Sequence, residues 1–161
     1  MSRGLCVGPA TAALLLAGCM ATGSPAAAKD DKAAIAGVMA SYQDALNASS
    51  TDAAMPLYTE DGVFMPPYSQ SAVGKAAVRQ AYDAVFRAIT LHVSFHIDEI
   101  VEMSPQWAFV RTNSAGTNTD HATGARTAEA NQELFIFRKG IDGSWKIARY
   151  SFSGTNPPRR G

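Results

Sequence analysis

The chain has 161 residues, enough for one domain with its own hydrophobic core. Its 14 basic and 14 acidic residues cancel, and the sequence pI is about 6.8, so nothing predicts the basic surface of a nucleic-acid-binding protein. Both cysteines, Cys6 and Cys19, precede Met20, which excludes a disulfide framework, a cysteine metal site and a thiol nucleophile from the rest of the chain.

The N-terminal segment has the pattern of a bacterial signal sequence. Arg3 precedes a small and apolar run over residues 7–17, which is long enough for a signal-peptide core and too short to cross a bilayer as a helix. The run ends in Leu16-Ala17-Gly18-Cys19, which resembles a lipobox, so Cys19 is the predicted lipidation site. Two alternatives stay open: a soluble secreted or periplasmic protein cut at Ala26-Ala27-Ala28, and an alanine-rich leader with an accidental cysteine.

These patterns divide the chain into four predicted parts. Residues 1–18 are the signal peptide, 19–31 a flexible tether rich in small residues, 32–156 one domain, and 157–161 a disordered tail. The predicted location is the bacterial cell envelope, with the membrane contacted only through the lipid anchor.

The first predicted helix covers residues 32–48. Its apolar residues recur at helical spacing on one face, and they are Ile35, Val38, Met39, Tyr42 and Leu46. Asp30 or Asp31 is the predicted cap of its start.

A short second helix is predicted to end at Tyr58, with Thr51 or Asp52 as its cap. A brief strand follows over residues 62–65. Pro66 and Pro67 lack the backbone N–H that ladder pairing needs, so they end this strand and a loop follows over 68–73.

Gly74 opens a third predicted helix, whose apolar face consists of Val78, Tyr82, Val85, Phe86 and Ile89. After this helix the apolar period changes from about 3.6 to 2, which predicts strands. Four strands are expected, over residues 91–103, 107–116, 128–139 and 144–153. Helices followed by hairpin-connected strands indicate an α+β fold, with a curved antiparallel sheet and the helices packed inside its curve.

Two segments carry a family resemblance. The run from Tyr58 to Pro67, YTEDGVFMPP, resembles the signature of the SnoaL-like branch of the nuclear transport factor two-like superfamily. The closing segments at 133–137 and 145–150 are also similar to the SnoaL-like ending. The resemblance implies a cone-shaped antiparallel sheet wrapped around three N-terminal helices, the ketosteroid isomerase-like or cystatin-like roll. It also implies a cavity inside the cone and a homodimer formed through the sheet.

The resemblance assigns two residues to an oxyanion site. Tyr42 matches the tyrosine donor of steroid isomerases, and Glu133 matches the carboxylic acid beside it. Tyr42 has an alternative role as a core tyrosine whose hydroxyl bonds a backbone carbonyl. Glu133 is either kept protonated by its apolar neighbours or ionised in a pair with Arg111 or Arg149.

The resemblance fails at the general base, because Pro66 stands where the steroid isomerases have a carboxylate. His96 is the candidate substitute, since histidine titrates near neutrality. It shares a strand face with His92 and Asp98, a pattern more typical of a solvated face. Residues two apart on a strand lie about 7 Å apart, so no metal site is expected from these three.

The predicted ligand-binding residues combine apolar and polar side chains. They are Tyr42, Tyr58, Phe64, Met65, Asn113, Asn131, Glu133 and Phe135. Strand alternation puts Asn131, Glu133 and Phe135 on one face. No nucleotide-binding or hydrolase motif occurs in the sequence, so no cofactor is expected.

The sequence leaves three functions open. The first is an envelope-anchored protein that binds a small apolar molecule in its conical pocket. The second is a cofactor-independent isomerase, cyclase or dehydratase acting on a carbonyl compound, in which Tyr42 and Glu133 stabilise an enolate and His96 or a water acts as base. The third is a dimeric interaction module without a ligand. Fold alone does not choose among them.

Overall fold

The computed structural model describes Met1 and residues 25–156, so Cys19, the predicted signal peptide and the predicted tail lie outside the described residues. Its helical elements are α1 (Pro25–Asn47), α2 (Thr51–Ala54), a 3-10 turn at Met55–Leu57 and α3 (Lys75–Ala88). Its strands are β1 (Tyr58–Met65), β2 (Ala72–Val73), β3 (Ile89–Ser104), β4 (Trp107–Asp120), β5 (Arg126–Lys139) and β6 (Trp145–Gly154).

Helix α1 buries the predicted apolar face but starts earlier than predicted. Ile35, Met39, Tyr42 and Leu46 are buried, as the helical spacing requires. The helix begins at Pro25, so residues 25–31, which the sequence assigned to the tether, are helical. Neither Asp30 nor Asp31 caps the start, because both lie inside the helix. Asp31 instead accepts hydrogen bonds from Lys139 Nζ at 2.6 Å and Trp145 Nε1 at 3.0 Å, which ties α1 to β5 and β6.

The segment between α1 and β1 is more compact than predicted. Ser50 caps α2, since its Oγ accepts a hydrogen bond from Ala53 N at 3.2 Å, so the predicted caps Thr51 and Asp52 are wrong. Tyr58 already belongs to β1, which makes this strand longer than predicted. The predicted loop at 68–73 contains the two-residue strand β2, which pairs with β1.

The six strands form one sheet in the order β2-β1-β6-β5-β4-β3. Four of the five strand pairs are antiparallel, which agrees with the predicted sheet, whereas β1 and β6 run parallel. The β1–β6 register shifts between Tyr58 and Val63. Gly62 sits in this irregular stretch, where a Cβ would lie 2.9 Å from Tyr58 Cδ1. Only glycine therefore allows the backbone to fold so closely onto that ring.

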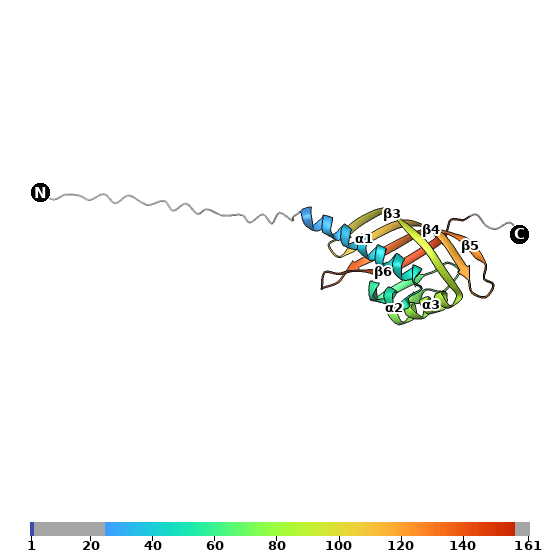
Figure 1. The fold of residues 1–161 in the computed structure, drawn as a ribbon. Coiled ribbons are helices and arrows are strands. Elements are labelled where there is room, and N and C mark those ends of the chain that lie inside the picture. The colour runs from blue at the N-terminus through green and yellow to red at the C-terminus, as the bar shows by residue number, and fades with distance from the viewer. Residues whose placement is uncertain (2–24, 157–161) are drawn as a thin grey trace.

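The helices cover one face of the curved sheet, and this confirms the predicted α+β architecture (Figure 1). Helix α1 contacts β3 and β6, and α3 contacts β1. The inner face of the sheet alternates as predicted, and its buried residues are Ala108, Val110, Thr112, Ser114, Asn131, Glu133, Phe135, Phe137, Trp145, Ile147 and Tyr150. No helix among the described residues is long and apolar enough to span a membrane.

Strand β3 is an edge strand of the sheet, and side chains of α1 form hydrogen bonds with its backbone. Asn47 Nδ2 donates to Val93 O at 2.9 Å, and Val93 N donates to Asn47 Oδ1 at 2.8 Å. Phe95 N donates to Gln43 Oε1 at 2.8 Å. Two helix side chains thus take the place that a neighbouring strand would occupy along this stretch.

Candidate functional site

A cavity of about 160 Å³ lies between the helices and the inner face of the sheet. Most of its wall is apolar and aromatic, from Leu46, Phe64, Pro66, Val85, Ile89, Leu91, Val93, Phe95 and Phe152. Three tyrosines and three other polar residues complete the wall: Tyr42, Tyr82, Tyr150, Ser114, Glu129 and Asn131. This combination is typical of ligand sites, where a few polar groups orient an apolar molecule.

Three buried tyrosines form a chain of hydroxyl groups beside the cavity. The Tyr82 hydroxyl is central: it bonds the Tyr42 hydroxyl through a short contact, and the Tyr58 hydroxyl at 2.9 Å. Tyr42 and Tyr82 line the cavity, whereas Tyr58 is fully buried behind Tyr82. The hydroxyl partner of Tyr42 is therefore another phenol and not the backbone carbonyl that the core alternative predicts.

The three tyrosine hydroxyls have one more hydrogen than the hydrogen bonds among them use. Three hydroxyls carry three hydrogens, and the two hydrogen bonds among them use two. If the spare hydrogen belonged to Tyr58, it would be a buried donor without a partner, which costs about 1–3 kcal/mol. The spare O–H therefore belongs to Tyr42 or Tyr82, or is passed from Tyr42 to the neighbouring Tyr150 hydroxyl, and all three residues line the cavity.

The tyrosines stay neutral in the physiological pH range. Burial raises the pKa values of Tyr42, Tyr58 and Tyr150 well above 10, and it also raises the pKa of Tyr82. Each phenol therefore keeps its hydrogen and acts as a donor, which is what an oxyanion or carbonyl oxygen requires.

Glu133 lies on the inner face of β5, 4% exposed, and is held by two hydroxyls. Thr112 Oγ1 donates to its Oε2 at 2.6 Å, and Ser114 Oγ donates to its Oε1 through a short contact. Burial raises the pKa of Glu133, and the two hydroxyl donors partly offset this effect. Glu133 does not line the cavity itself, but its partner Ser114 does.

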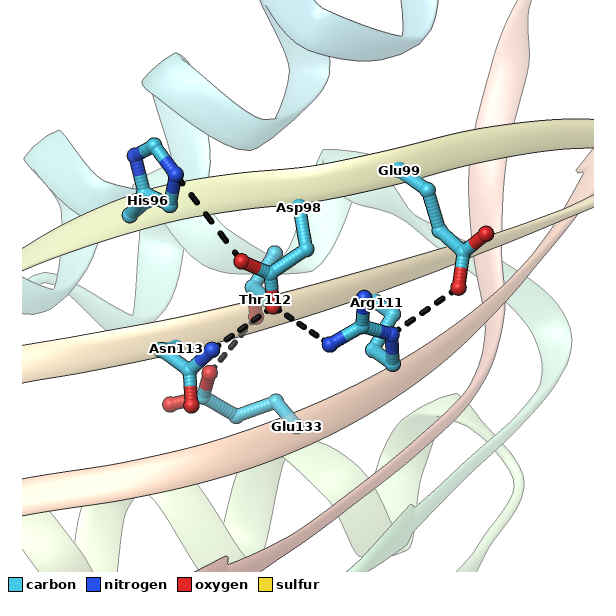
Figure 2. Close-up of polar contacts among 7 residues, drawn as sticks. All are labelled: His96, Asp98, Glu99, Arg111, Thr112, Asn113 and Glu133. Carbon is cyan, nitrogen blue, oxygen red and sulfur yellow. Dashed lines mark hydrogen bonds and ion pairs between the residues drawn. The ribbon is translucent and has the colours of Figure 1, made fainter.

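The predicted ion pair of Glu133 with Arg111 or Arg149 is wrong. Arg111 lies on the outer face, where it binds Asp98 at 2.7 Å and Glu99 at 2.9 Å (Figure 2). The Arg149 guanidinium donates to the backbone oxygens of Asp61 and Ala148.

A second carboxylate, Glu129, lies on the cavity wall. Asn118 Nδ2 donates to its Oε2 at 2.5 Å, and Asn131 Nδ2 donates to its Oε1 at 3.0 Å. Thr127 Oγ1 in turn donates to Asn118 Oδ1 at 2.7 Å and fixes that amide. Both amides are neutral, so they orient the carboxylate without cancelling its charge.

The geometry agrees with what the chain resembles in sequence. A family model described as a SnoaL-like domain matches residues 38–150. The chain belongs to the SnoaL-like family. No curated protein matches it.

Solved structures give the same fold. A ketosteroid isomerase-like protein from Erwinia carotovora atroseptica is 41% identical, with 78% of this chain and 96% of that chain covered and a TM-score of 0.75. A nuclear transport factor 2-like superfamily protein from Salmonella enterica is 14% identical, with 83% and 96% covered and a TM-score of 0.70. A scytalone dehydratase candidate from Novosphingobium aromaticivorans is 18% identical, with 83% and 89% covered and a TM-score of 0.71. The last two likenesses concern the fold alone.

In this SnoaL-like domain, the predicted ligand-binding residues divide into three groups. Tyr42, Phe64 and Asn131 line the cavity. Tyr58, Glu133 and Phe135 are buried behind its wall; the Phe135 ring stacks on Tyr150 with centroids 4.1 Å apart. Met65 and Asn113 do not reach it. Met65 follows Phe64 on β1 and points to the other face, and Asn113 donates to Asp98 on the outer face at 2.6 Å.

His96 also lies away from the cavity. Its side chain is 81% exposed on the outer face of β3, with Nε2 3.8 Å from Asp98 Oδ1 (Figure 2). The suggestion that His96 serves as base for a molecule in the cavity is therefore corrected, since the sheet separates the two. Among residues 25–156, no group of three or more histidine and carboxylate side chains is arranged to hold a metal ion.

Pro66, the residue that the sequence resemblance matched to the general base of steroid isomerases, lines the cavity with an apolar ring. The sequence also failed to indicate several site residues: Tyr82, Tyr150, Phe95, Ser114 and Glu129. Tyr82 could have been found, because it lies on the apolar face of the third predicted helix. Ser114 and Glu129 gave no such signal, because they lie near the ends of the strands predicted over 107–116 and 128–139, where polar residues are usually solvated.

Proposed function

We propose that the SnoaL-like domain binds a small, mostly apolar molecule whose acceptor oxygen receives the spare tyrosine O–H. The tyrosine chain carries this proposal, because its proton count leaves one donor for a cavity whose wall is mostly apolar. A carbonyl or phenolate oxygen would complete the chain, and the aromatic wall would enclose the rest of the molecule.

The cavity size limits the molecule. Sites for drug-sized ligands usually measure about 300–1,000 Å³, whereas this cavity measures about 160 Å³. We therefore expect a ligand of one or two rings. Phe64 stacks on Tyr82 and Tyr150 with centroids 5.0 and 5.5 Å apart, so this part of the wall is a run of aromatic rings that suits such a ligand.

A matched pair of probes tests the proposal. Acetophenone and α-methylstyrene have nearly the same shape, but only the ketone accepts a hydrogen bond. We expect Tyr42→Phe, combined with Tyr82→Phe, to weaken acetophenone binding about tenfold and to leave α-methylstyrene binding unchanged, as measured by NMR titration. Tyr68→Phe is the matched control, because the Tyr68 ring is fully exposed. Equal effects on both probes would refute the proposed role of the tyrosines.

Catalysis of the isomerase, cyclase or dehydratase type is the second candidate. One observation favours it: a phenolic donor that holds a carbonyl oxygen would hold the enolate more strongly, because charge develops on that oxygen. With Pro66 in the family's base position and His96 outside, the base would be water or Glu129. Exchange of the acetophenone methyl hydrogens in D₂O distinguishes the candidates. Exchange that Tyr42→Phe combined with Tyr82→Phe abolishes indicates an enzyme, and binding without exchange indicates a binding protein.

We also propose that the domain works in the cell envelope, anchored through lipidated Cys19. The lipobox-like run before Cys19 supports this location. Cys19→Ser should move the full chain from the membrane fraction of a bacterial host to the soluble fraction. An unchanged distribution would contradict the anchor.

A homodimer through the outer sheet face is part of the same proposal. Val101, Phe109 and Ile136 are register neighbours across β3, β4 and β5, and Leu134 is 46% exposed on the same face. Light scattering should give a dimer mass that Leu134→Glu reduces to a monomer mass. If the protein dimerises but none of the probe molecules binds in its cavity, the result would favour the third function, a dimeric interaction module without a ligand.

A further inference from the structure

The polar wall of the cavity has a surplus of acceptors. Glu129 receives one amide hydrogen on each oxygen, from Asn118 and Asn131. A carboxylate has about four lone-pair sites, so two amide donors leave about half of its capacity unused. Asn131 Nδ2 also reaches Ser114 Oγ at 3.5 Å, and the Ser114 hydroxyl donates to Glu133, so these groups have no donor left for a ligand.

Within the part of the chain that the structure describes, no cationic side chain pairs with Glu129. None of the ion pairs formed by the described residues includes it. Its nearest hydrogen-bond partners are two neutral amides, and Glu133 lies four residues along the same strand face. A carboxylate on a largely apolar wall is costly unless it gains a partner.

The carboxylate and the tyrosine donor lie at different ends of the wall. Tyr42 packs on Phe135, with ring centroids 5.6 Å apart, and Glu129 is six residues from Phe135 along β5. The cavity wall therefore offers a donor beside Tyr42 and, separately, an acceptor at Glu129.

We propose that Glu129 selects ligands that carry a hydrogen-bond donor, a hydroxyl or an ammonium group, on an otherwise apolar frame. This inference rests on the proposed binding function and narrows its ligand class. A hydroxyl would donate to the free lone pairs of the carboxylate. An ammonium group would also balance its charge, and the aromatic rings elsewhere on the cavity wall favour a cation as well.

Three probes of equal size test the selection: ethylbenzene, benzyl alcohol and benzylammonium. Their dissociation constants are measured by NMR titration for the unmodified protein, for Glu129→Gln, and for Glu60→Gln. Glu60 is the matched control because its side chain is 85% exposed and forms a surface ion pair with Lys75. We expect Glu129→Gln to weaken benzyl alcohol, benzylammonium or both about tenfold, with ethylbenzene and the control unaffected. Whichever probe responds identifies the donor as hydroxyl or ammonium.

The outcomes separate this inference from the function on which it rests. If all three probes bind and Glu129→Gln changes their affinities alike or not at all, the donor selection is overturned and ligand binding stands. If none of the three binds the unmodified protein up to its solubility limit, both are overturned. Should Glu129→Gln not fold, the side-chain amide signals of Asn118 and Asn131 serve instead. They should shift with the alcohol or the ammonium probe and not with ethylbenzene; equal shifts would overturn the selection.

Discussion

Removing the central hydroxyl of the tyrosine chain should destabilise the domain more than removing a terminal one. Tyr82→Phe breaks two hydrogen bonds at once. It leaves the Tyr58 hydroxyl, in a side chain that is 0% exposed, without a partner, which costs about 1–3 kcal/mol. Loss of the hydrogen bond to Tyr42 costs only about 1 kcal/mol, because the Tyr42 hydroxyl still faces the cavity, where a water can replace the Tyr82 hydroxyl as its partner. The expected loss is about 2–4 kcal/mol of unfolding free energy.

Tyr58→Phe is the informative comparison, because it deletes the same atom at the buried end of the chain. Only the bond to Tyr82 is lost, and no buried donor is left without a partner, so the expected loss is about 1 kcal/mol. Tyr68→Phe should have no effect, since that ring is fully exposed. The free energies come from urea unfolding, with equal m-values confirming that the variants unfold alike. If Tyr58→Phe cost as much as Tyr82→Phe, the proton count and the donor assigned to the cavity would both be wrong.

Three further predictions concern stability. Glu133→Gln should flatten the dependence of stability on pH, because burial raises the pKa of Glu133 above its ordinary 4.5. The contribution of Glu133 to the free energy of unfolding is therefore full below pH 4.5 and is lost as pH rises through the folded pKa. Over that range the stability of the variant should increase relative to that of the unmodified protein. Asp31→Asn should act in the opposite direction, because the hydrogen bond from Lys139 holds the pKa of Asp31 below its ordinary 3.8. Near neutrality the variant should have about 1 kcal/mol less unfolding free energy than the unmodified protein. This difference should disappear as pH falls through the folded pKa. Gly116→Ala should cost roughly 2–3 kcal/mol, because the new Cβ would lie 1.9 Å from the backbone oxygen of His92.

Thermal and urea unfolding at several pH values measure all three, and each has a simple check. A parallel pH curve for Glu133→Gln would show that the buried carboxylate does not titrate with folding. An Asp31→Asn loss that persists in strong acid would assign the effect to packing instead of charge. Gly37→Ala is the control for Gly116→Ala: nothing lies within 4 Å of a Cβ at Gly37, on an exposed part of α1, so this change should stabilise by about 0.5–1 kcal/mol.

The sequence predicted features that depend on local periodicity. The buried face of α1 follows from the spacing of Ile35, Met39 and Tyr42, and the inner face of β5 follows from the alternation of Asn131, Glu133 and Phe135. Both patterns are short-range, so the chain carries them without reference to its partners. The family resemblance supplied the remainder of the architecture.

Features that depend on which elements meet in space could not be predicted in this way. The parallel pairing of β1 with β6 joins segments about 90 residues apart, and no local pattern encodes it. The Glu133 partners could not be predicted for the same reason: Thr112 and Ser114 lie on a neighbouring strand, and the strand register puts Arg111 on the other face. His96 has suitable chemistry on the wrong side of the sheet, which only its strand register reveals.

The amide side chains of Gln43 and Asn47 have a consequence for the behaviour of the molecule in concentrated solution. An uncovered terminal strand of a sheet is a template onto which another chain can add, and this is a common start of fibrous aggregation. Here the middle of β3 has its N–H and C=O groups engaged by a helix of the same chain. The first helix therefore protects solubility as well as filling the core, and fraying of its last turn would expose a surface to which a second molecule can attach.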